Sequence, residues 1–229
     1  MTATRAAEAM EKLAGETLIL PSLLQCDFGN LKQEIERLEE ANVKALHLDV
    51  MDGQFVPNIS YGMPILEGIR RLTDMPLDVH LMISTPGDYI QQFVDAGADC
   101  VTIHAEIEQD HSEVLQQIRE QGVGVGLAIN PDTPLSAVEK SLSLCDLFLV
   151  MSVNAGFGGQ AFNPVALDKL KALKDLNEDL LLEVDGGVNL GTIQSCSDAG
   201  ASLLVVGSAI FGQADYAAAV EGLRSAIGR

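Results

Sequence analysis

Apolar and polar residues follow two different periods along this chain, and the two periods alternate. Short runs rich in Val, Ile and Leu are typical of buried strands, whereas longer segments with an apolar residue every three to four positions predict amphipathic surface helices. Residues 31–40 and 164–176 are clear examples of the second kind. The first kind predicts eight strands, at residues 17–22, 45–50, 77–82, 100–104, 124–129, 147–152, 180–184 and 203–206.

Strands that alternate with helices indicate an α/β fold built on a parallel sheet. Eight such units within 229 residues predict a (β/α)8 barrel, the TIM barrel, with an open doubly wound sheet as the alternative. The length suits one well-buried core. We therefore expect a single barrel domain over residues 17–229, preceded by a short helical extension at residues 1–16.

The charge of the chain limits its partners. It carries 33 acidic and 14 basic residues, a formal net charge of −19, which repels nucleic acid and anionic membranes. An anionic substrate must then be held locally, by backbone N–H groups or by a metal. Four widely spaced cysteines without a C-x-x-C pair suit the reducing cytoplasm, and no apolar run approaches the roughly 20 residues of a membrane span.

Acidic and histidine side chains gather near the ends of the predicted strands. His47 and Asp49 share one face of the second strand, because side chains two apart in a strand point the same way. His80 lies near the end of the third strand and Asp185 follows the seventh. Two His and two Asp predict a divalent metal site, for zinc first, although iron, manganese or cobalt fits the same ligands. The alternatives are a structural His-x-Asp pair and an Asp185 that caps the next helix.

A metal beside two carboxylates suits proton abstraction next to a carbonyl group. If Asp49 and Asp185 flank a planar intermediate on opposite faces, one removes a proton and the other returns one, which inverts the stereocentre. Met51, Met82 and Met151 fall at strand ends, where their thioethers either line a dry pocket or fill the core.

Glycine-rich segments follow three of the later strands. They are Gly156-Phe157-Gly158-Gly159, Gly186-Gly187 and Gly207-Ser208. Glycine lets backbone N–H groups approach phosphate oxygens closely, and barrel loops after strands seven and eight often hold phosphate. These segments therefore predict a phosphate site, while the lack of a G-x-G-x-x-G motif in the first βα unit argues against a dinucleotide. Ser22 is expected to bond either a substrate hydroxyl or its own turn, and His104 to support the site from behind.

Seven segments of the chain resemble the ribulose-phosphate 3-epimerase family, in order, from about Leu18 to Phe211. They are PSLL (21–24), HLDVMDGQFVPN (47–58), DVHLM (78–82), VMSVN (150–154), GFGGQ (156–160), EVDGG (183–187) and GS (207–208). The resemblance implies a metal-assisted epimerase that interconverts D-ribulose 5-phosphate and D-xylulose 5-phosphate through an enediolate, in pentose phosphate metabolism. It also implies a cytoplasmic homo-oligomer, either a dimer or a hexamer.

The resemblance further implies a role for each residue of the site. The metal would be bound by His47, Asp49, His80 and Asp185. Asp49 and Asp185 would be the acid/base pair. Ser22 and His80 would contact the sugar, and the three glycine segments would hold its phosphate.

The chain departs from the family pattern at two places near the site. It has Gln25-Cys26-Asp27 where the family usually has Ser-Ala-Asp, and Ala155 where the family usually has Pro, which makes that loop less rigid. Two other functions stay open: a hexulose-6-phosphate 3-epimerase, which shares the metal ligands, and a non-catalytic barrel that binds metal or sugar phosphate. A related decarboxylase is disfavoured, because the segment after Asp49 lacks the lysine of its Asp-x-Lys-x-x-Asp array.

Overall fold

The computed structural model describes residues 2–228, and within them eight strands all pair in parallel. Four strands keep their predicted bounds, and the other four differ from them by one residue at one or both ends. The strands are β1 Leu18–Pro21, β2 Leu46–Met51, β3 Leu77–Met82, β4 Cys100–His104, β5 Gly124–Ile129, β6 Leu147–Met151, β7 Leu181–Asp185 and β8 Leu203–Val206.

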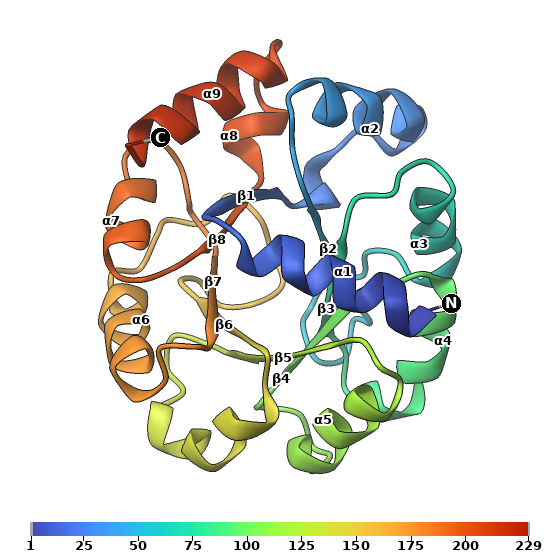
Figure 1. Ribbon diagram of the computed structural model, residues 1–229, viewed down its shortest axis with the longest axis vertical. Coiled ribbons are helices and arrows are strands. Elements are labelled where there is room, and N and C mark those ends of the chain that lie inside the picture. The colour runs from blue at the N-terminus through green and yellow to red at the C-terminus, as the bar shows by residue number, and fades with distance from the viewer. Residues whose placement is uncertain (1, 229) are drawn as a thin grey trace.

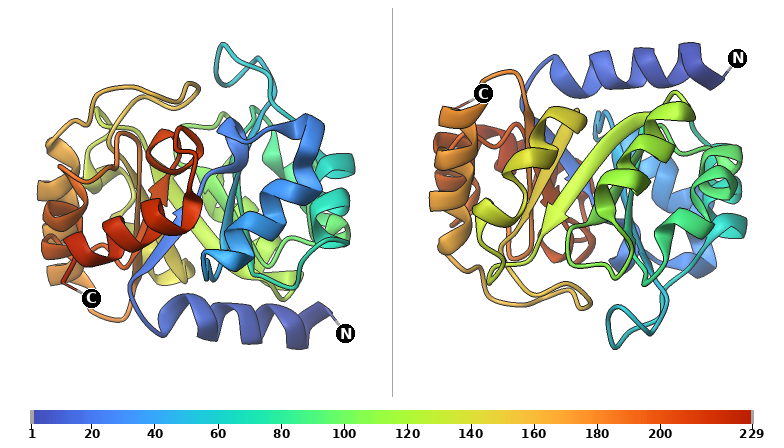
Figure 2. Two further views of the ribbon diagram at one scale, coloured as in Figure 1. Left: turned by 90° about the horizontal axis from the view of Figure 1, so that it is seen from above. Right: turned by 90° about the horizontal axis from the view of Figure 1, so that it is seen from below.

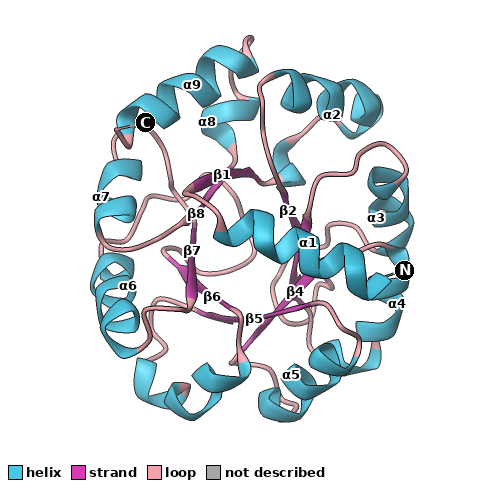
Figure 3. Ribbon diagram, in the orientation of Figure 1, coloured by secondary structure: helices cyan, strands magenta, loops and turns pink. Residues whose placement is uncertain are grey.

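The strands form one sheet in the order β1-β8-β7-β6-β5-β4-β3-β2, and the sheet curls until β1 and β2 meet. A parallel bridge between Ser22 and His47 joins these two strands. Figure 3 shows the strands as a ring with the helices outside it. The predicted (β/α)8 barrel is therefore confirmed, and the open doubly wound sheet is wrong.

Helices cover the outside of the barrel (Figure 1). Between β5 and β6 the described chain forms only the short 3-10 helices η4 Leu135–Ala137 and η5 Glu139–Leu144. The outer α-helices are α2 Leu31–Glu40, α3 Met63–Arg70, α4 Ile90–Ala96, α5 His111–Glu120, α6 Val165–Leu176, α7 Ile193–Asp198, α8 Ser208–Phe211 and α9 Tyr216–Ala226. Further 3-10 helices are η1 Leu23–Gln25, η2 Phe28–Asn30 and η3 Pro86–Asp88.

The interior of the barrel is apolar at one end and polar towards the other. Leu18, Leu147 and Leu203 pack together inside the ring, near the N-terminal ends of the strands, because side chains alternate between the two faces of each strand. Histidines and acidic side chains of β2, β3, β4 and β7 replace them nearer the carboxyl ends, and most of these are buried. Buried charged groups require partners, so they mark the part of the barrel where a site can form.

Helix α1 (Thr2–Ala14) lies across the N-terminal end of the barrel, as Figures 1 and 2 show. Leu13 is fully buried in the inner apolar cluster, and Met10 packs against it. Arg5 Nε donates to Asp99 Oδ1 across 2.7 Å, which ties the helix to the residue before β4. The loops that follow β2 and β6 project from the opposite end of the barrel (Figure 2).

Candidate active site

Four side chains meet at the carboxyl ends of three strands. His47 and Asp49 come from β2, and parallel pairing places Asp49 in register with His80 of β3. Asp185 ends β7, on another side of the ring. One ligand atom from each of the four residues lies within 4.8 Å of the others. The fold thus brings together all four residues that the sequence predicts as metal ligands.

Asp49 is the centre of this cluster. Its Oδ2 accepts a hydrogen bond from Ser22 Oγ across 2.5 Å. Its Oδ1 lies 3.3 Å from His47 Nε2 and 3.1 Å from His80 Nδ1. One oxygen is therefore held by Ser22, the residue that follows β1, while two imidazole nitrogens from β2 and β3 converge on the other.

The donor set of the cluster fits a divalent cation. His47 Nε2 is buried and has no hydrogen-bond partner among the described residues, although an unpaired buried nitrogen costs free energy. Two imidazole nitrogens and two carboxylates are ligands that zinc, iron, manganese and cobalt accept. A cation among them would satisfy His47 Nε2 and compensate the buried acidic groups.

The electrostatic environment separates the two aspartates. Burial raises the pKa of Asp185 to about 7, and the negative charge of Asp49 adds to this shift. Burial alone would also raise the pKa of Asp49, but the neighbouring His47 and His80 hold it below its usual range. The two carboxyl groups therefore differ in proton affinity although they share one site.

Asp185 does not cap a helix, so that alternative interpretation is wrong. The next helix, α7, begins at Ile193, and its N-cap residue is Thr192. Asp185 is instead followed directly by Gly186 and Gly187, which turn the chain with φ of +105° and +61°. This turn leaves the carboxyl group of Asp185 facing the cluster rather than a helix end.

Two further carboxyl groups lie behind His47, and the sequence pattern had singled out neither. Asp78 Oδ2 is 2.6 Å from His47 Nδ1, and Glu183 Oε1 is 3.1 Å from the same nitrogen. Burial and the charge of Asp78 raise the pKa of Glu183 far above its usual range. A signal was available, because Asp78 precedes His80, and Glu183 precedes Asp185, by two positions on one strand face.

A cavity of about 230 Å³ opens at this end of the barrel, and both Asp49 and Asp185 line it. His47 and His80 are fully buried next to it. Apart from His80, every residue expected to bind substrate also lines the cavity: Ser22, Met51, Met82, Met151, Gly156, Phe157, Gly158, Gly159, Gly186, Gly187, Gly207 and Ser208.

The glycine segments form a wall of backbone on one side of the cavity. φ is +125° at Gly156, +77° at Gly159 and +61° at Gly187, in the left-handed region that other residues avoid. A Cβ atom at Gly187 would lie 2.6 Å from the backbone nitrogen of Phe162. The turn after β7 therefore packs directly on the loop after β6, in a way that only glycine permits.

The sequence model of the Ribulose-phosphate 3 epimerase family matches residues 18–211 of the chain, and this range includes all of these site residues. The chain belongs to this family. It is 46% identical over 211 residues to the ribulose-phosphate 3-epimerase of Bacillus subtilis, covering 90% of this chain and 97% of that protein. It is 44% identical over 214 residues to the ribulose-phosphate 3-epimerase of Synechocystis, covering 91% of this chain and 93% of that protein.

Solved structures of proteins with other names share this fold. A crystal structure of 3-hexulose-6-phosphate synthase superimposes with a TM-score of 0.70 at 18% identity and covers 92% of this chain and 99% of that one. A tryptophan synthase alpha-subunit from Pyrococcus furiosus superimposes with a TM-score of 0.69 at 15% identity, covering 93% of this chain and 99% of that one. At such identities the likeness establishes the barrel alone.

Gln25 is a cavity residue that the family pattern did not point to, since the family usually has Ser there. Its side chain lies beside Gly158 and Gly207, in space that a Cβ atom on Gly158 would enter. An amide thus stands between two of the glycine segments of this epimerase-family barrel.

Proposed function

We propose that this protein interconverts D-ribulose 5-phosphate and D-xylulose 5-phosphate by inverting C3. The single observation that carries the proposal is the placement of Asp49 and Asp185, which come from β2 and β7 and line one cavity in a chain of the ribulose-phosphate 3 epimerase family. Relatives at 46% and 44% identity bear the name ribulose-phosphate 3-epimerase. The reaction belongs to pentose phosphate metabolism.

His47, Asp49, His80 and Asp185 are the residues that would hold a divalent cation, which we take to be zinc before iron, manganese or cobalt. When bound, such a cation stabilises the negative charge that develops on a substrate oxygen as a proton leaves the neighbouring carbon. Cation content of the purified protein, measured by elemental analysis, tests this part of the proposal.

The proton transfers fall to the two aspartates. One carboxylate removes the C3 proton of the substrate to give a planar enediolate, and the other, protonated, delivers a proton to the opposite face of C3. Ser22 keeps Asp49 oriented through the hydrogen bond to Oδ2. Met51, Met82 and Met151 line the cavity with apolar thioethers, which exclude water from the reactive intermediate.

The phosphate of the substrate is assigned to the glycine segments. The chain has a net charge of −19, so an anion must be held by local groups rather than by the overall field. Backbone N–H groups at Gly158, Gly187 and Gly207 are suited to this role, because these residues line the cavity and have no side chain of their own to cover the backbone.

Solvent-deuterium incorporation at C3 of ribulose 5-phosphate, followed by NMR in deuterium oxide, tests the function. We expect incorporation together with xylulose 5-phosphate, loss of both after chelation, and loss by about 10²- to 10⁴-fold in Asp185→Asn. Exchange into a hexulose 6-phosphate alone would favour the hexulose epimerase, and no exchange in folded, metal-loaded protein would favour the non-catalytic barrel.

The cellular setting is part of the same proposal. No helix in the described chain is long and apolar enough to span a membrane. We infer a cytoplasmic homo-oligomer, a dimer or a hexamer, without nucleic acid or membrane partners, in keeping with a net charge of −19. Light scattering on the eluting protein measures the oligomer directly.

A further inference from the structure

A chain of hydrogen-bonding groups leads away from the candidate metal site through His80. The Nδ1 of His80 faces Asp49 Oδ1 at 3.1 Å, and its Nε2 lies 2.8 Å from His104 Nε2. On the far side, His104 Nδ1 lies 2.9 Å from Glu106 Oε2. Both imidazole rings are fully buried and stacked, with centroids 4.9 Å apart. The chain therefore runs from Asp49 to Glu106 without a gap.

The partners of Glu106 fix the direction of these hydrogen bonds. Its Oε1 accepts from the backbone N–H of Asn130 across 2.7 Å and from the hydroxyl of Thr133. Burial would raise the pKa of Glu106, but His104 and the hydrogen bonds from Thr133 and Asn130 lower it to about 2. The group is therefore a carboxylate, its Oε2 also accepts, and the donor is the Nδ1–H of His104. Neutral His104 then has a bare Nε2, which accepts from the Nε2–H of His80.

The position of the proton on His104 decides which nitrogen of His80 is free to bind the metal. A neutral imidazole carries one proton, so a His80 that donates from Nε2 presents a bare Nδ1 towards Asp49. His104 protonated on both nitrogens would donate to His80 instead and would place the His80 proton on Nδ1, where it blocks a cation. Only the first arrangement is compatible with a metal at Nδ1.

We propose that Glu106 is a positioning residue that sets, through His104, the tautomer in which His80 meets the metal. The proposal rests on the proposed metal site. The two histidine ligands would then bind the metal through different ring nitrogens. His47 contacts Asp78 through Nδ1 and presents Nε2 to the metal, whereas His80 presents Nδ1. Two separate carboxylates thus hold the two imidazoles: the buried Asp78 directly, and the partly buried Glu106 through a second histidine.

Glu106 is itself held firmly and is connected to the glycine wall. Lys169 Nζ donates to the carbonyl oxygens of Asn130, Pro131 and Thr133 at 2.7–2.9 Å, which fixes the turn that supplies both donors to Glu106 Oε1. The side-chain oxygen of Asn130 accepts from the backbone N–H of Ala155, directly before Gly156. One braced turn therefore contacts both Glu106 and the loop after β6.

Zinc affinity of Glu106→Gln, measured by competition with a chromophoric chelator, tests the proposal without an activity assay. The glutamine oxygen keeps the donors of Asn130 and Thr133, so its NH₂ group meets His104 Nδ1 and opposes the Nδ1–H tautomer. We expect affinity to fall about 10- to 100-fold. Glu108→Gln is the matched control, because Glu108 is exposed, carries the same charge and lies two residues away. Unchanged affinity in Glu106→Gln, or an equal loss in both variants, would overturn the proposal.

The tautomers can also be read in the unmodified, zinc-loaded protein by long-range ¹H–¹⁵N NMR of its histidines. The expected pattern is His104 neutral with its proton on Nδ1, and His80 with its proton on Nε2. A His104 proton on Nε2 would refute the role of Glu106 while leaving the metal site intact. Failure of the unmodified protein to bind zinc, iron, manganese or cobalt would refute the metal site itself, and with it this inference.

Discussion

The hydroxyl of Ser22 donates to Asp49 Oδ2 across 2.5 Å, at the point where β1 and β2 close the barrel. Both side chains are buried, so this bond orients Asp49 without competition from water. Ser22→Ala removes the hydrogen bond that Asp49 Oδ2 accepts and is expected to lower kcat/KM about 10-fold, which is about 1.4 kcal/mol. Steady-state kinetics with ribulose 5-phosphate measure this loss.

Ser208→Ala serves as the contrast to Ser22→Ala. Ser208 lines the same cavity beside Gly207 and belongs to a segment assigned to the phosphate. We expect loss of the Ser208 hydroxyl to raise KM for the sugar phosphate while zinc affinity stays unchanged. Ser22→Ala should instead weaken zinc binding, because it leaves Asp49 less well oriented. Identical effects of the two variants on KM and on zinc affinity would contradict these separate roles.

Gly187→Ala is expected to damage the glycine wall. The residue has φ of +61°, and its new Cβ would meet the backbone nitrogen of Phe162 at 2.6 Å. Strain of this kind costs about 1–3 kcal/mol, so we expect a lower unfolding free energy and a higher KM for the sugar phosphate. Urea unfolding and steady-state kinetics report the two effects separately.

Gly68→Ala is the matched control for Gly187→Ala. Gly68 lies within α3, and beyond its chain neighbours and the nearby backbone of its own helix no described atom is within 4 Å of the Cβ it would gain. Alanine in a helix interior should raise the unfolding free energy by about 0.5–1 kcal/mol and leave KM unchanged. A Gly187→Ala protein as stable and as active as Gly68→Ala would show that the turn after β7 tolerates a side chain.

The alternation of apolar runs and helical periods predicted the fold, except after β5, where prolines replace an expected α-helix with 3-10 helices. The apolar runs located every strand to within a residue, because buried parallel strands are continuous stretches of Val, Ile and Leu. After β5 the described chain has 3-10 helices in place of an α-helix. Pro131 and Pro134 start that segment, and proline disfavours helical backbone in the residue before it.

The site was predictable only where its residues stand at strand ends. His47, Asp49, His80 and Asp185 fell there, so strand alternation and barrel geometry sufficed to bring them together. The supporting carboxylate Glu106 lies beyond β4 and reaches His104 only because the turn at Asn130 and Thr133 holds it. The contacts of Glu106 with Asn130 and Thr133 join loops that are far apart in sequence. Such contacts have no period, so no pattern could reveal how Glu106 is held.

Helix α1 is expected to contribute stability rather than catalysis. Leu13 is fully buried at the N-terminal end of the barrel, far along the strands from Asp49 and Asp185. Leu13→Ala should lower the unfolding free energy by about 2–5 kcal/mol, because it leaves a cavity beneath the strands, with kcat unchanged below the new melting temperature. Thermal and urea unfolding, with kinetics at 25 °C, test both parts.

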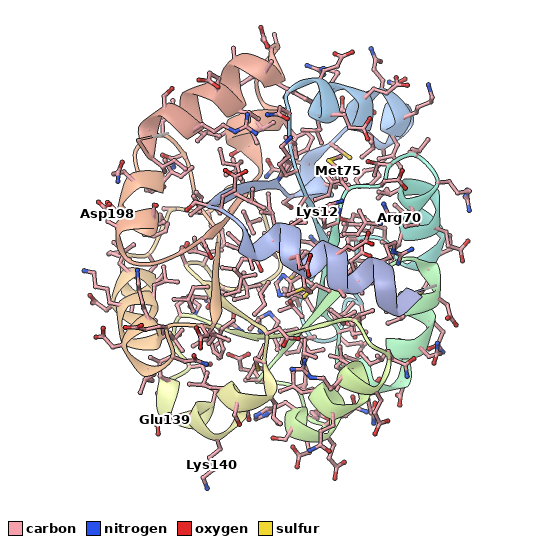
Figure 4. The ribbon with its side chains drawn as sticks, viewed as in Figure 1. Lys12, Arg70, Met75, Glu139, Lys140 and Asp198 are labelled. Atoms are coloured by element: carbon pink, nitrogen blue, oxygen red, sulfur yellow. The ribbon has the colours of Figure 1, made fainter. Side chains whose placement is uncertain are left out.

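Lys12→Ala is the control on the same helix, since Lys12 is exposed and labelled in Figure 4. Its truncation should change the unfolding free energy by no more than about 0.5 kcal/mol. This pair also tests the proposal that residues 1–16 are an extension added to a barrel domain at 17–229. A Leu13→Ala protein that loses turnover while still folded would show that the extension shapes the active site.

The thiols are expected to be inert in the folded protein. Burial raises the pKa of Cys196 to about 12, well above the value of about 9 for a free thiol. Above about pH 9 the thiol of the unfolded chain loses its proton while that of the folded protein keeps it. The unfolding free energy therefore falls as pH rises above about 9, and this group has no effect on it near pH 7. At pH 8.5 iodoacetamide should label Cys196 only in urea, because the side chain is buried in the core. Rapid labelling of Cys196 in the native protein would contradict this and would mean that α7 opens locally.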